Sequence, residues 1–410
     1  MRRLIFTWIL FFPLTLFSRT IVAGKGQLVQ TLRQAISIAK DGDTIQLHKG
    51  VYKEGNNIID KTLCLIGIGN PVLDGEGKHE ILTITGKNTV IRGITLINAG
   101  YSSMNDFAAI KIIDASGIII ANNTITNAAF AVHISNSTNS SVTGNTIRGT
   151  NRSEHSSGNG IHLWKCSGMK IADNSISGHR DGIYLEFVTE SAISKNVSER
   201  NIRYGLHFMF SHNDTYSRNI FRNNGAGVAV MYSKNVKMEL NTFDQNWGAS
   251  AYGILLKDIS DSYISHNTFY KNTVGIHMEG SSRIIILKNV FKENGWALKV
   301  QASCDDNVFH HNNFYGNSFD IATNGAKTLN KFHNNYWDKY EGYDMNKDGI
   351  GDIPYHPVSM YSMIVEQNPT TLILMRSFMV SLIDKAEKAF PGLTPEDLVD
   401  TQPSLKPNNL

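Results

Sequence analysis

"GIYLEFVTESAISKNVSERNIRYGLHFMF" (Gly182–Phe210) contains one pattern twice, a glycine followed by alternating apolar residues, and the second copy starts 23 positions after the first. The pattern recurs through the middle of the chain at steps of 22 to 26 residues. The other copies are "GIHLW" from 160, "GVAVMY" from 227, "GILLK" from 253, "GIHME" from 275 and, without its glycine, "ALKVQ" from 297. A fixed period of this length identifies a repeat protein, in which each unit buries its apolar face only against its neighbours.

A second pattern, Asn-x-apolar, keeps the same spacing from "NTI" at 123 and 145 to "NNF" at 312. Asn tolerates the left-handed backbone of tight corners, and its side-chain amide can bond to the next coil. A leucine-rich repeat would need an L-x-x-L-x-L pattern, and a propeller would need a longer period. We therefore predict an all-β fold, a single-stranded right-handed parallel β-helix (solenoid) with coils of about 22 residues.

The first residues have the pattern of a secretory signal peptide. Arg2 and Arg3 precede an apolar run from Leu4 to Phe17, and Ala23 offers a small residue for cleavage. A retained anchor would need about 20 apolar residues, more than this run provides. We expect residues 1–23 to be removed and the mature protein to be exported and soluble.

Two segments follow the predicted signal peptide. Residues 24–357 are the expected β-helix, with a helix at 28–40 covering its first open end. Residues 358–410 depart from the repeat and are expected to form a C-terminal helical extension. Its long helix begins at Asn368–Pro369, and a shorter helix begins at 394–397.

In-register stacking places equivalent residues of successive coils about 4.8 Å apart. The fourth residue after each glycine then forms a column that contains Glu186, Met209 and Met231, and the second residue forms a column that contains His207. Because the intervening apolar residues fill the core, we expect both columns to face outward. Met209 would lie beside Met231, with His207 on the same strand.

Two thioethers and an imidazole form a soft set of ligands, which favours Cu(I) over zinc, calcium or magnesium. His212 follows the strand and is placed to complete the site, with Glu186 on the preceding coil. The alternative is an apolar patch of Met209, Met231 and Tyr232 for a protein partner, because Met-rich surfaces adapt to many partners. The remaining outward histidines lack sulfur neighbours and are expected to be ordinary surface residues; they are His133, His162 and His277.

Several long motifs resemble the NosD family, the periplasmic β-helix maturation proteins of nitrous oxide reductase. They include "DGIYLEFV", "RYGLHFMFS", "GAGVAVMYS", "AYGILLKDI", "NNYWDKYEGYDMNKDGIGDIPYHP" and the tail "YSMIVEQNPTTLILMRSFMVSLIDKAEKAFPGLTPEDLV". The resemblance covers most of the mature chain and implies a periplasmic, copper-handling role. It also implies three partners: an ABC transporter with its membrane subunit and ATPase, a copper chaperone lipoprotein, and the apo reductase that receives the copper. His207, Met209 and Met231 lie within two of these motifs.

A second candidate metal site is "DMNKDGIGD" (344–352), which matches the first nine positions of a calcium-binding loop. The ligand positions are Asp344, Asn346, Asp348, the carbonyl of Ile350, and Asp352. Position twelve is Tyr355, where such loops have a bidentate Glu. Calcium as a structural brace and a turn with self-satisfied side chains both remain open.

The long helix of the extension carries more apolar surface than one stripe requires, at Met375, Phe378, Met379 and Leu382. This surface either seals the last coil, as open repeat stacks need, or docks a partner. The resemblance implies the transporter or the reductase as that partner.

Other classes of function fit less well. The net charge of +3 and the lack of a basic run argue against nucleic-acid binding. A polysaccharide lyase, hydrolase or epimerase would need paired carboxylates, whereas Glu186 and Glu279 are four coils apart, roughly 19 Å. A purely structural adhesin leaves the sulfur pair unexplained. We expect a copper-binding accessory protein that is not an enzyme.

Overall fold

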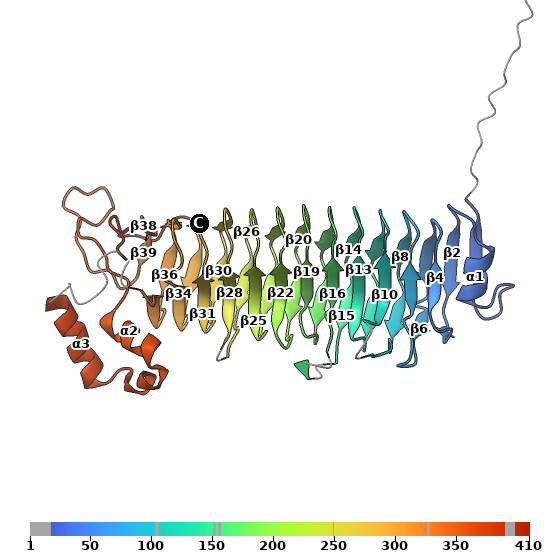
Figure 1. The fold of residues 1–410 in the computed structure, drawn as a ribbon, viewed down its shortest axis with the longest axis horizontal. Coiled ribbons are helices and arrows are strands. Elements are labelled where there is room, and N and C mark those ends of the chain that lie inside the picture. Colours follow the sequence, from blue (N-terminus) through green and yellow to red (C-terminus); the bar gives the residue numbers. More distant parts are fainter. Residues whose placement is uncertain are drawn as a thin grey trace, which may run out of the picture.

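The computed structural model describes residues 18–102, 106–150, 153–154, 157–248, 250–325, 329–389 and 398–410. In these residues the chain winds into a right-handed parallel β-helix, with three long sheets running along its axis (Figure 1). Each full coil contributes one short strand to each sheet, and each strand pairs in parallel with its equivalents on the neighbouring coils. The predicted fold class is confirmed.

Each sheet is a row of strands that stack in chain order along the axis. Sheet A consists of β1 (Thr20–Ala23), β2 (Thr44–His48), β5 (Cys64–Ile68), β8 (Val90–Arg92), β11 (Ile119–Ala121), β14 (Ser141–Thr143), β17 (Lys170–Ala172), β20 (Ala192–Ser194), β23 (Thr215–Ser217), β26 (Lys237–Glu239), β29 (Tyr263–Ser265), β32 (Ile285–Leu287), β35 (Val308–His310) and β38 (Lys331–His333). Sheet B consists of β3 (Val51–Tyr52), β6 (Val72–Asp74), β9 (Thr95–Ile97), β12 (Thr124–Thr126), β15 (Thr146–Arg148), β18 (Ser175–Ser177), β21 (Val197–Glu199), β24 (Ile220–Arg222), β27 (Thr242–Asp244), β30 (Thr268–Tyr270), β33 (Val290–Lys292), β36 (Asn313–Tyr315) and β39 (Tyr336–Trp337). Sheet C consists of β4 (Asn57–Ile59), β7 (Leu82–Ile84), β10 (Ala108–Ile113), β13 (Phe130–Ser135), β16 (Ile161–Trp164), β19 (Ile183–Glu186), β22 (Tyr204–Met209), β25 (Ala226–Met231), β28 (Tyr252–Lys257), β31 (Val274–Glu279), β34 (Trp296–Val300) and β37 (Phe319–Ala322). The helices are α1 (Leu32–Ile38), α2 (Met360–Gln367), the 3-10 helix η2 (Pro369–Leu374) and α3 (Phe378–Ala389).

The interior is held together by like residues that stack from coil to coil. Inward-facing phenylalanines of sheet B form a continuous stack from Phe221 to Phe314, with ring centroids 4.7 to 5.5 Å apart. Trp337 continues the stack at 4.0 Å from Phe314. These rings are fully or almost fully buried, and each buries its faces only against the coils on either side.

The Asn-x-apolar pattern marks a buried ladder of side-chain amides. The main-chain N–H and the side-chain amide of Asn219 both donate to Oδ1 of Asn241, at 3.0 Å each. Asn241 donates in the same way to Asn267 on the next coil. The predicted bond between coils is confirmed, but the left-handed corner belongs to the residue before each ladder Asn. Residues of many types occupy it, including Arg218 and Leu240.

The N-terminal cap is shorter than predicted. Thr31 caps α1, which starts at Leu32 because the Thr31 hydroxyl accepts a hydrogen bond from the Gln34 N–H. Leu28 lies outside the helix and is fully exposed. Residues 1–17 of the predicted signal peptide lie outside the described residues. Residues 20–23 form β1 and pair with β2, so cleavage after Ala23 would remove the first strand of sheet A.

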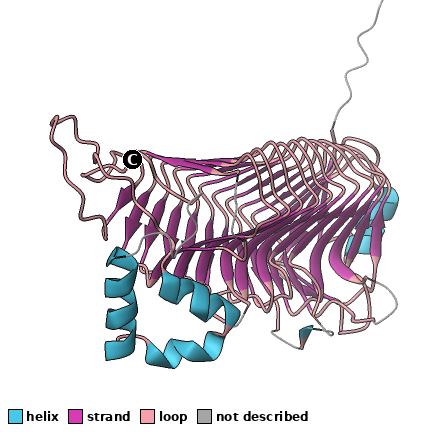
Figure 2. Cartoon of the chain, turned by 60° about the vertical axis from the view of Figure 1, so that its left-hand side comes forward, coloured by secondary structure: helices cyan, strands magenta, loops and turns pink. Residues whose placement is uncertain are grey.

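The described helices of the C-terminal extension do not seal the last coil, and α2 lies against the side of the solenoid (Figure 2). Tyr361 and Val365 of α2 form an apolar cluster with Trp296 and Phe319 on the outer face of sheet C. The prediction of one long helix from Asn368 was wrong, because the chain breaks at Arg376, which has a φ of +67°. Phe390 and the second helix predicted at 394–397 lie outside the described residues.

The open end of the last coil is instead closed by residues 398–404, which return to the solenoid. Leu398 packs in the main core. The buried carboxylate of Asp400 accepts hydrogen bonds from the N–H and side-chain amide of Asn335 and from Trp337 Nε1, at 3.0 to 3.1 Å. The extension is therefore only partly helical, and its last residues belong to the β-helix.

Candidate metal centre

The register of sheet C brings together the predicted soft ligands. Met209 on β22 pairs directly with Met231 on β25, and Glu186 on β19 pairs with Met209. All three side chains are half-buried on the outer face of the sheet. These strands lie near the middle of the solenoid (Figure 1). The two thioethers are therefore neighbours, and they are accessible from outside the molecule.

His207 lies on the same outer face but is buried, with 4% of its surface exposed. Its ring packs between Tyr184 and Tyr204, with centroid distances of 4.8 and 4.9 Å. Neither ring nitrogen has a hydrogen-bond partner among the described residues. A buried polar atom without a partner costs about 1–3 kcal/mol. Because the Asp181 carboxylate lies 3.6 Å from Nδ1, Nε2 is the nitrogen left to bind a ligand.

Asp181 and Arg203 stand behind His207, and the sequence alone did not identify them as part of the site. The fully buried carboxylate of Asp181 lies 3.6 Å from His207 Nδ1. Arg203 donates to both Asp181 oxygens, at 2.9 and 2.6 Å. Burial would raise the pKa of Asp181, but His207 and Arg203 outweigh it and lower the pKa to about 2. Asp181 is therefore charged at neutral pH.

The other predicted surface histidines are also buried, which corrects the expectation from the sequence. His133, His162 and His277 are each less than 10% exposed. His162 packs against His133 and Tyr184, with centroids 4.7 and 4.8 Å away. Burial lowers the pKa of His162 to about 3, so its ring is neutral. An outward position in a solenoid is covered when bulky neighbours on adjacent coils pack over it.

His212 is not in the column of the sulfur ligands. It follows the corner at Phe210, and its backbone forms a parallel β-bridge with Thr189 on the preceding coil. Its Nδ1 accepts a hydrogen bond from the Lys234 N–H at 3.2 Å. One nitrogen of this ring is thus already engaged.

An exposed aromatic stack borders the methionines. Phe187, Phe210 and Tyr232 directly follow Glu186, Met209 and Met231 in the sequence. Their ring centroids are 5.3 and 5.0 Å apart, and 38 to 45% of each residue is exposed. All three have a positive φ of 50 to 53°, which is rare for bulky residues and costs roughly 1–2 kcal/mol each. This exposed aromatic surface supports the alternative in which Met209, Met231 and Tyr232 form an apolar patch for a protein partner. It is also compatible with a metal site at the methionines.

The calcium-like loop turns its oxygens toward its own backbone. Asp344 accepts hydrogen bonds from the N–H groups of Lys347, Asp348 and Gly349. The other acceptors are Asn346, Asp348 and Asp352, which bind the N–H groups of Asp348, Ile350 and Met345. This arrangement is that of a self-satisfied turn. Calcium binding by the loop stays a prediction.

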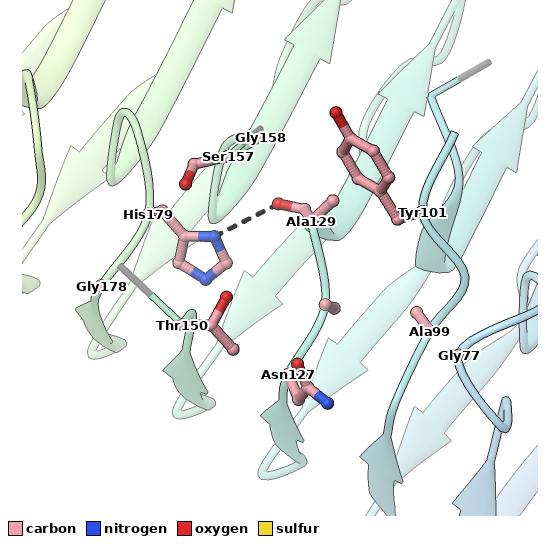
Figure 3. Close-up of a pocket in the computed structure, with 11 residues that line it drawn as sticks. Gly77, Ala99, Tyr101, Asn127, Ala129, Thr150, Ser157, Gly158, Gly178 and His179 are labelled. Carbon is pink, nitrogen blue, oxygen red and sulfur yellow. Dashed lines mark hydrogen bonds between the residues drawn. The ribbon is translucent and has the colours of Figure 1, made fainter. Parts of the chain in front are cut away.

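A separate cavity of about 80 Å³ lies where an insertion at about residues 150–158 interrupts the repeat, and its lining includes Tyr101, Ala129, Thr150 and His179 (Figure 3). The buried His179 donates from Nδ1 to the carbonyl oxygen of Ala129 at 3.3 Å. Burial lowers the pKa of His179 to about 4, so the ring is neutral. The cavity has room for a few water molecules, and its described lining includes no sulfur or carboxylate group.

No three His, Cys, Asp or Glu side chains in the described part of the chain are arranged to hold a metal ion. The candidate centre therefore depends on thioether ligands. In the same residues, no helix has the length and apolar character needed to cross a membrane.

Solved structures similar to this chain include two parallel β-helix enzymes. The catalytic unit of a thermostable GH87 α-1,3-glucanase from Streptomyces thermodiastaticus matches with a TM-score of 0.61 and 13% identity, over 75% of this chain and 65% of that one. The catalytic domain of a GH87 α-1,3-glucanase in complex with nigerose matches with a TM-score of 0.58 and 11% identity, over 78% of this chain and 69% of that one. Identities this low establish the fold alone.

Sequence relatives define the family. Residues 147–347 match the profile described as "Periplasmic copper-binding protein (NosD)". A "Probable ABC transporter binding protein NosD" from Pseudomonas aeruginosa is 30% identical over 398 residues, which cover 90% of each chain. A protein of the same name from Stutzerimonas stutzeri is 27% identical over 405 residues, 94% of this chain and 92% of that one. The chain belongs to the NosD family of periplasmic copper-binding proteins.

Proposed function

We propose that this protein is a non-catalytic periplasmic copper carrier that delivers Cu(I) to nitrous oxide reductase during assembly of the reductase's metal clusters. It would receive copper from a lipoprotein chaperone and work on an ABC transporter. The main supporting observation is the Met209–Met231 pair, which lies in register beside a buried His207 whose Nε2 has no hydrogen-bond partner among the described residues.

Asp181 would orient the His207 ring. Imidazoles that bind metals commonly direct their second nitrogen at a carboxylate, and Asp181 lies 3.6 Å from Nδ1. This arrangement leaves Nε2 for the copper ion. The negative charge of Asp181 would also favour a bound cation, while Arg203 keeps that carboxylate in place.

The two methionines suit a carrier better than a permanent site. Thioethers remain unprotonated and are weak, neutral ligands for soft Cu(I), so they release the ion to a partner with stronger ligands. Their half-buried position leaves them accessible to such a partner. Glu186 would flank the ion on the preceding coil. His212 would act as an outer residue, because its Nδ1 already binds the backbone.

Competition with a chromophoric Cu(I) chelator tests the site. Replacing Met209 and Met231 with leucine keeps the apolar volume but removes both sulfur atoms, so Cu(I) affinity should fall strongly. Met278→Leu is the matched control, because Met278 is on the same sheet but points into the core. Both variants should keep the circular dichroism of the parent. Parental Cu(I) affinity in the double variant would reject the assignment.

We further propose that the helical extension docks the transporter. Phe378, Met379 and Leu382 on α3 are 82, 54 and 50% exposed, and Met375 is 37% exposed. An apolar surface of this kind commonly marks an interaction site. The names of the two relatives, which describe ABC transporter binding proteins, support this partner.

Serine substitutions at Phe378, Met379 and Leu382 test the docking surface. Stability and Cu(I) affinity should stay at parental values, because these side chains lie outside the core, whereas capture of the transporter in a pull-down should fail. Leu240→Ser is a suitable control, because Leu240 is similarly exposed at a corner of the solenoid. Full recovery of the transporter by the triple variant would show that it docks elsewhere.

A further inference from the structure

Three histidines meet at the edge of sheet A, near the C-terminal end of the solenoid. His310 ends β35, His311 follows it, and His333 ends β38 on the next coil. His310 and His333 are in register, and their rings stack with centroids 5.2 Å apart and an angle of 15° between the planes. All three side chains are half-buried.

His310 and His311 present their rings to each other, although successive residues in a strand normally point to opposite faces. The reason is the corner at His311, where a φ of +54° turns the chain and brings both rings to the outside. Their Nδ1 atoms are 3.0 Å apart, and the ring planes are 79° apart. Two imidazole nitrogens this close share either a proton or a cation.

We propose that His310 and His311 form a second metal site, which chelates a divalent ion such as Cu(II) or Ni(II) through the two Nδ1 atoms. With metal–nitrogen bonds of about 2.0–2.1 Å, a separation of 3.0 Å subtends roughly 95° at the ion. Tetragonal Cu(II) and Ni(II) use angles near 90°, whereas tetrahedral zinc needs wider ones. Water would occupy the remaining positions.

The surroundings favour a neutral, exchangeable site. Burial lowers the pKa of both His310 and His311, and the neighbouring His333 and Lys288 lower it further. Both rings therefore take up a proton less readily than a free imidazole does, which favours metal binding. Lys288 also repels a bound cation, so the site should bind less tightly than an isolated pair of imidazoles.

This site does not depend on the proposed Cu(I) function. It lies on sheet A and consists of nitrogen ligands, whereas the candidate Cu(I) centre lies on sheet C and contains sulfur. The two sites therefore differ in the metal they prefer.

Titration with Cu(II) alone, on full-length protein without a polyhistidine tag, tests the proposal. Electron paramagnetic resonance of the parent should show an axial Cu(II) signal with nitrogen coupling. His310→Ala and His311→Ala should each lose it, and Lys288→Gln should bind more tightly. His266→Ala is the matched control, because His266 occupies the same corner as His311 two coils earlier and has a positive φ. Melting curves check that each variant is folded.

The outcomes are distinct for the two sites. Loss of the Cu(II) signal in the His310 and His311 variants, with unchanged Cu(I) affinity, supports the histidine site. This result does not depend on whether Met209 and Met231 bind Cu(I). If the parent gives no such signal, or if the double variant of His310 and His311 keeps it, the pair is merely joined by an N–H···N hydrogen bond and the proposal is wrong.

Discussion

Asp214 is a buried carboxylate whose replacement by Asn should stabilise the protein in a pH-dependent way. The residue is fully buried, and its Oδ1 accepts a hydrogen bond from the Ser191 N–H at 2.8 Å. Its Oδ2 has no partner among the described residues. Burial, aided by Glu190, raises the pKa of Asp214 from 3.8 to about 8.

The sign of the effect follows from proton uptake. Between about pH 4 and pH 8 the folded protein holds a proton on Asp214 that the unfolded chain has lost, so the free energy of unfolding falls as the pH rises. A folded pKa of about 8 predicts a loss of roughly 2–3 kcal/mol between pH 5 and pH 7. Asp214→Asn removes this loss. Asn307 occupies the equivalent place four coils later, where its amide donates to the Ser281 carbonyl at 2.9 Å, so Asn fits this position.

Urea denaturation of parent and variant at pH 5 and pH 7 measures the effect. The advantage of Asp214→Asn over the parent should grow by roughly 2–3 kcal/mol between the two pH values. Comparing parent with variant cancels the titration of every other group that the substitution leaves unchanged. Asp173→Asn, at an exposed corner, is the control. An advantage of the same size at both pH values would refute the reasoning.

Three further predictions concern the aromatic core, the Asp181 carboxylate beside His207 and the calcium-like loop. Phe291→Ala should cost about 3–5 kcal/mol in urea denaturation, because the ring is fully buried between Phe269 and Phe314; a cost below about 1 kcal/mol would mean that the stack relaxes around the gap. Asp181→Asn should weaken Cu(I) binding about 10–100-fold in the chelator competition, and an unchanged affinity would remove Asp181 from the site. Asp344→Ala with Asp348→Ala should lower the melting temperature only when calcium is present, by mass action on the folded state. If a chelator leaves the melting temperature of the parent unchanged, the loop is a turn without calcium.

The repeat period was enough to predict the neighbours of each residue along a column. Because coil length fixes which positions stack, the pairing of Met209 with Met231 and of Glu186 with Met209 could be predicted without a structure. The same reasoning predicted the amide ladder, because an Asn that recurs at one position of each coil stacks on the equivalent Asn of both neighbouring coils.

Burial on the outer face could not be predicted in this way. The ring of His207 is covered by Tyr204 and lies over Asp181, and the Arg203 that holds this carboxylate is 3.9 Å from Glu154 of the insertion. These contacts depend on rotamers and on a segment outside the repeat. The extension was also mispredicted, because helical spacing cannot show a break at Arg376 or packing against Trp296 and Phe319 on the side of the solenoid.

The closure of the amide ladder by Asp400 gives the solenoid an electrical direction. Each ladder Asn donates one side-chain hydrogen to Oδ1 of the Asn that follows and the other to a main-chain carbonyl of the preceding coil. The side-chain amides therefore point the same way and their dipoles add, as peptide dipoles do in a helix. The positive end of this array lies at the last coil, where it meets a carboxylate that only accepts hydrogen bonds. Asp400 thus places a negative charge at the positive end of the ladder, as an acidic residue does at the N-terminus of a helix. An artificially lengthened version of this solenoid would need an acid at that end, whereas a final Asn would leave the amide hydrogen that faces the next coil without an acceptor.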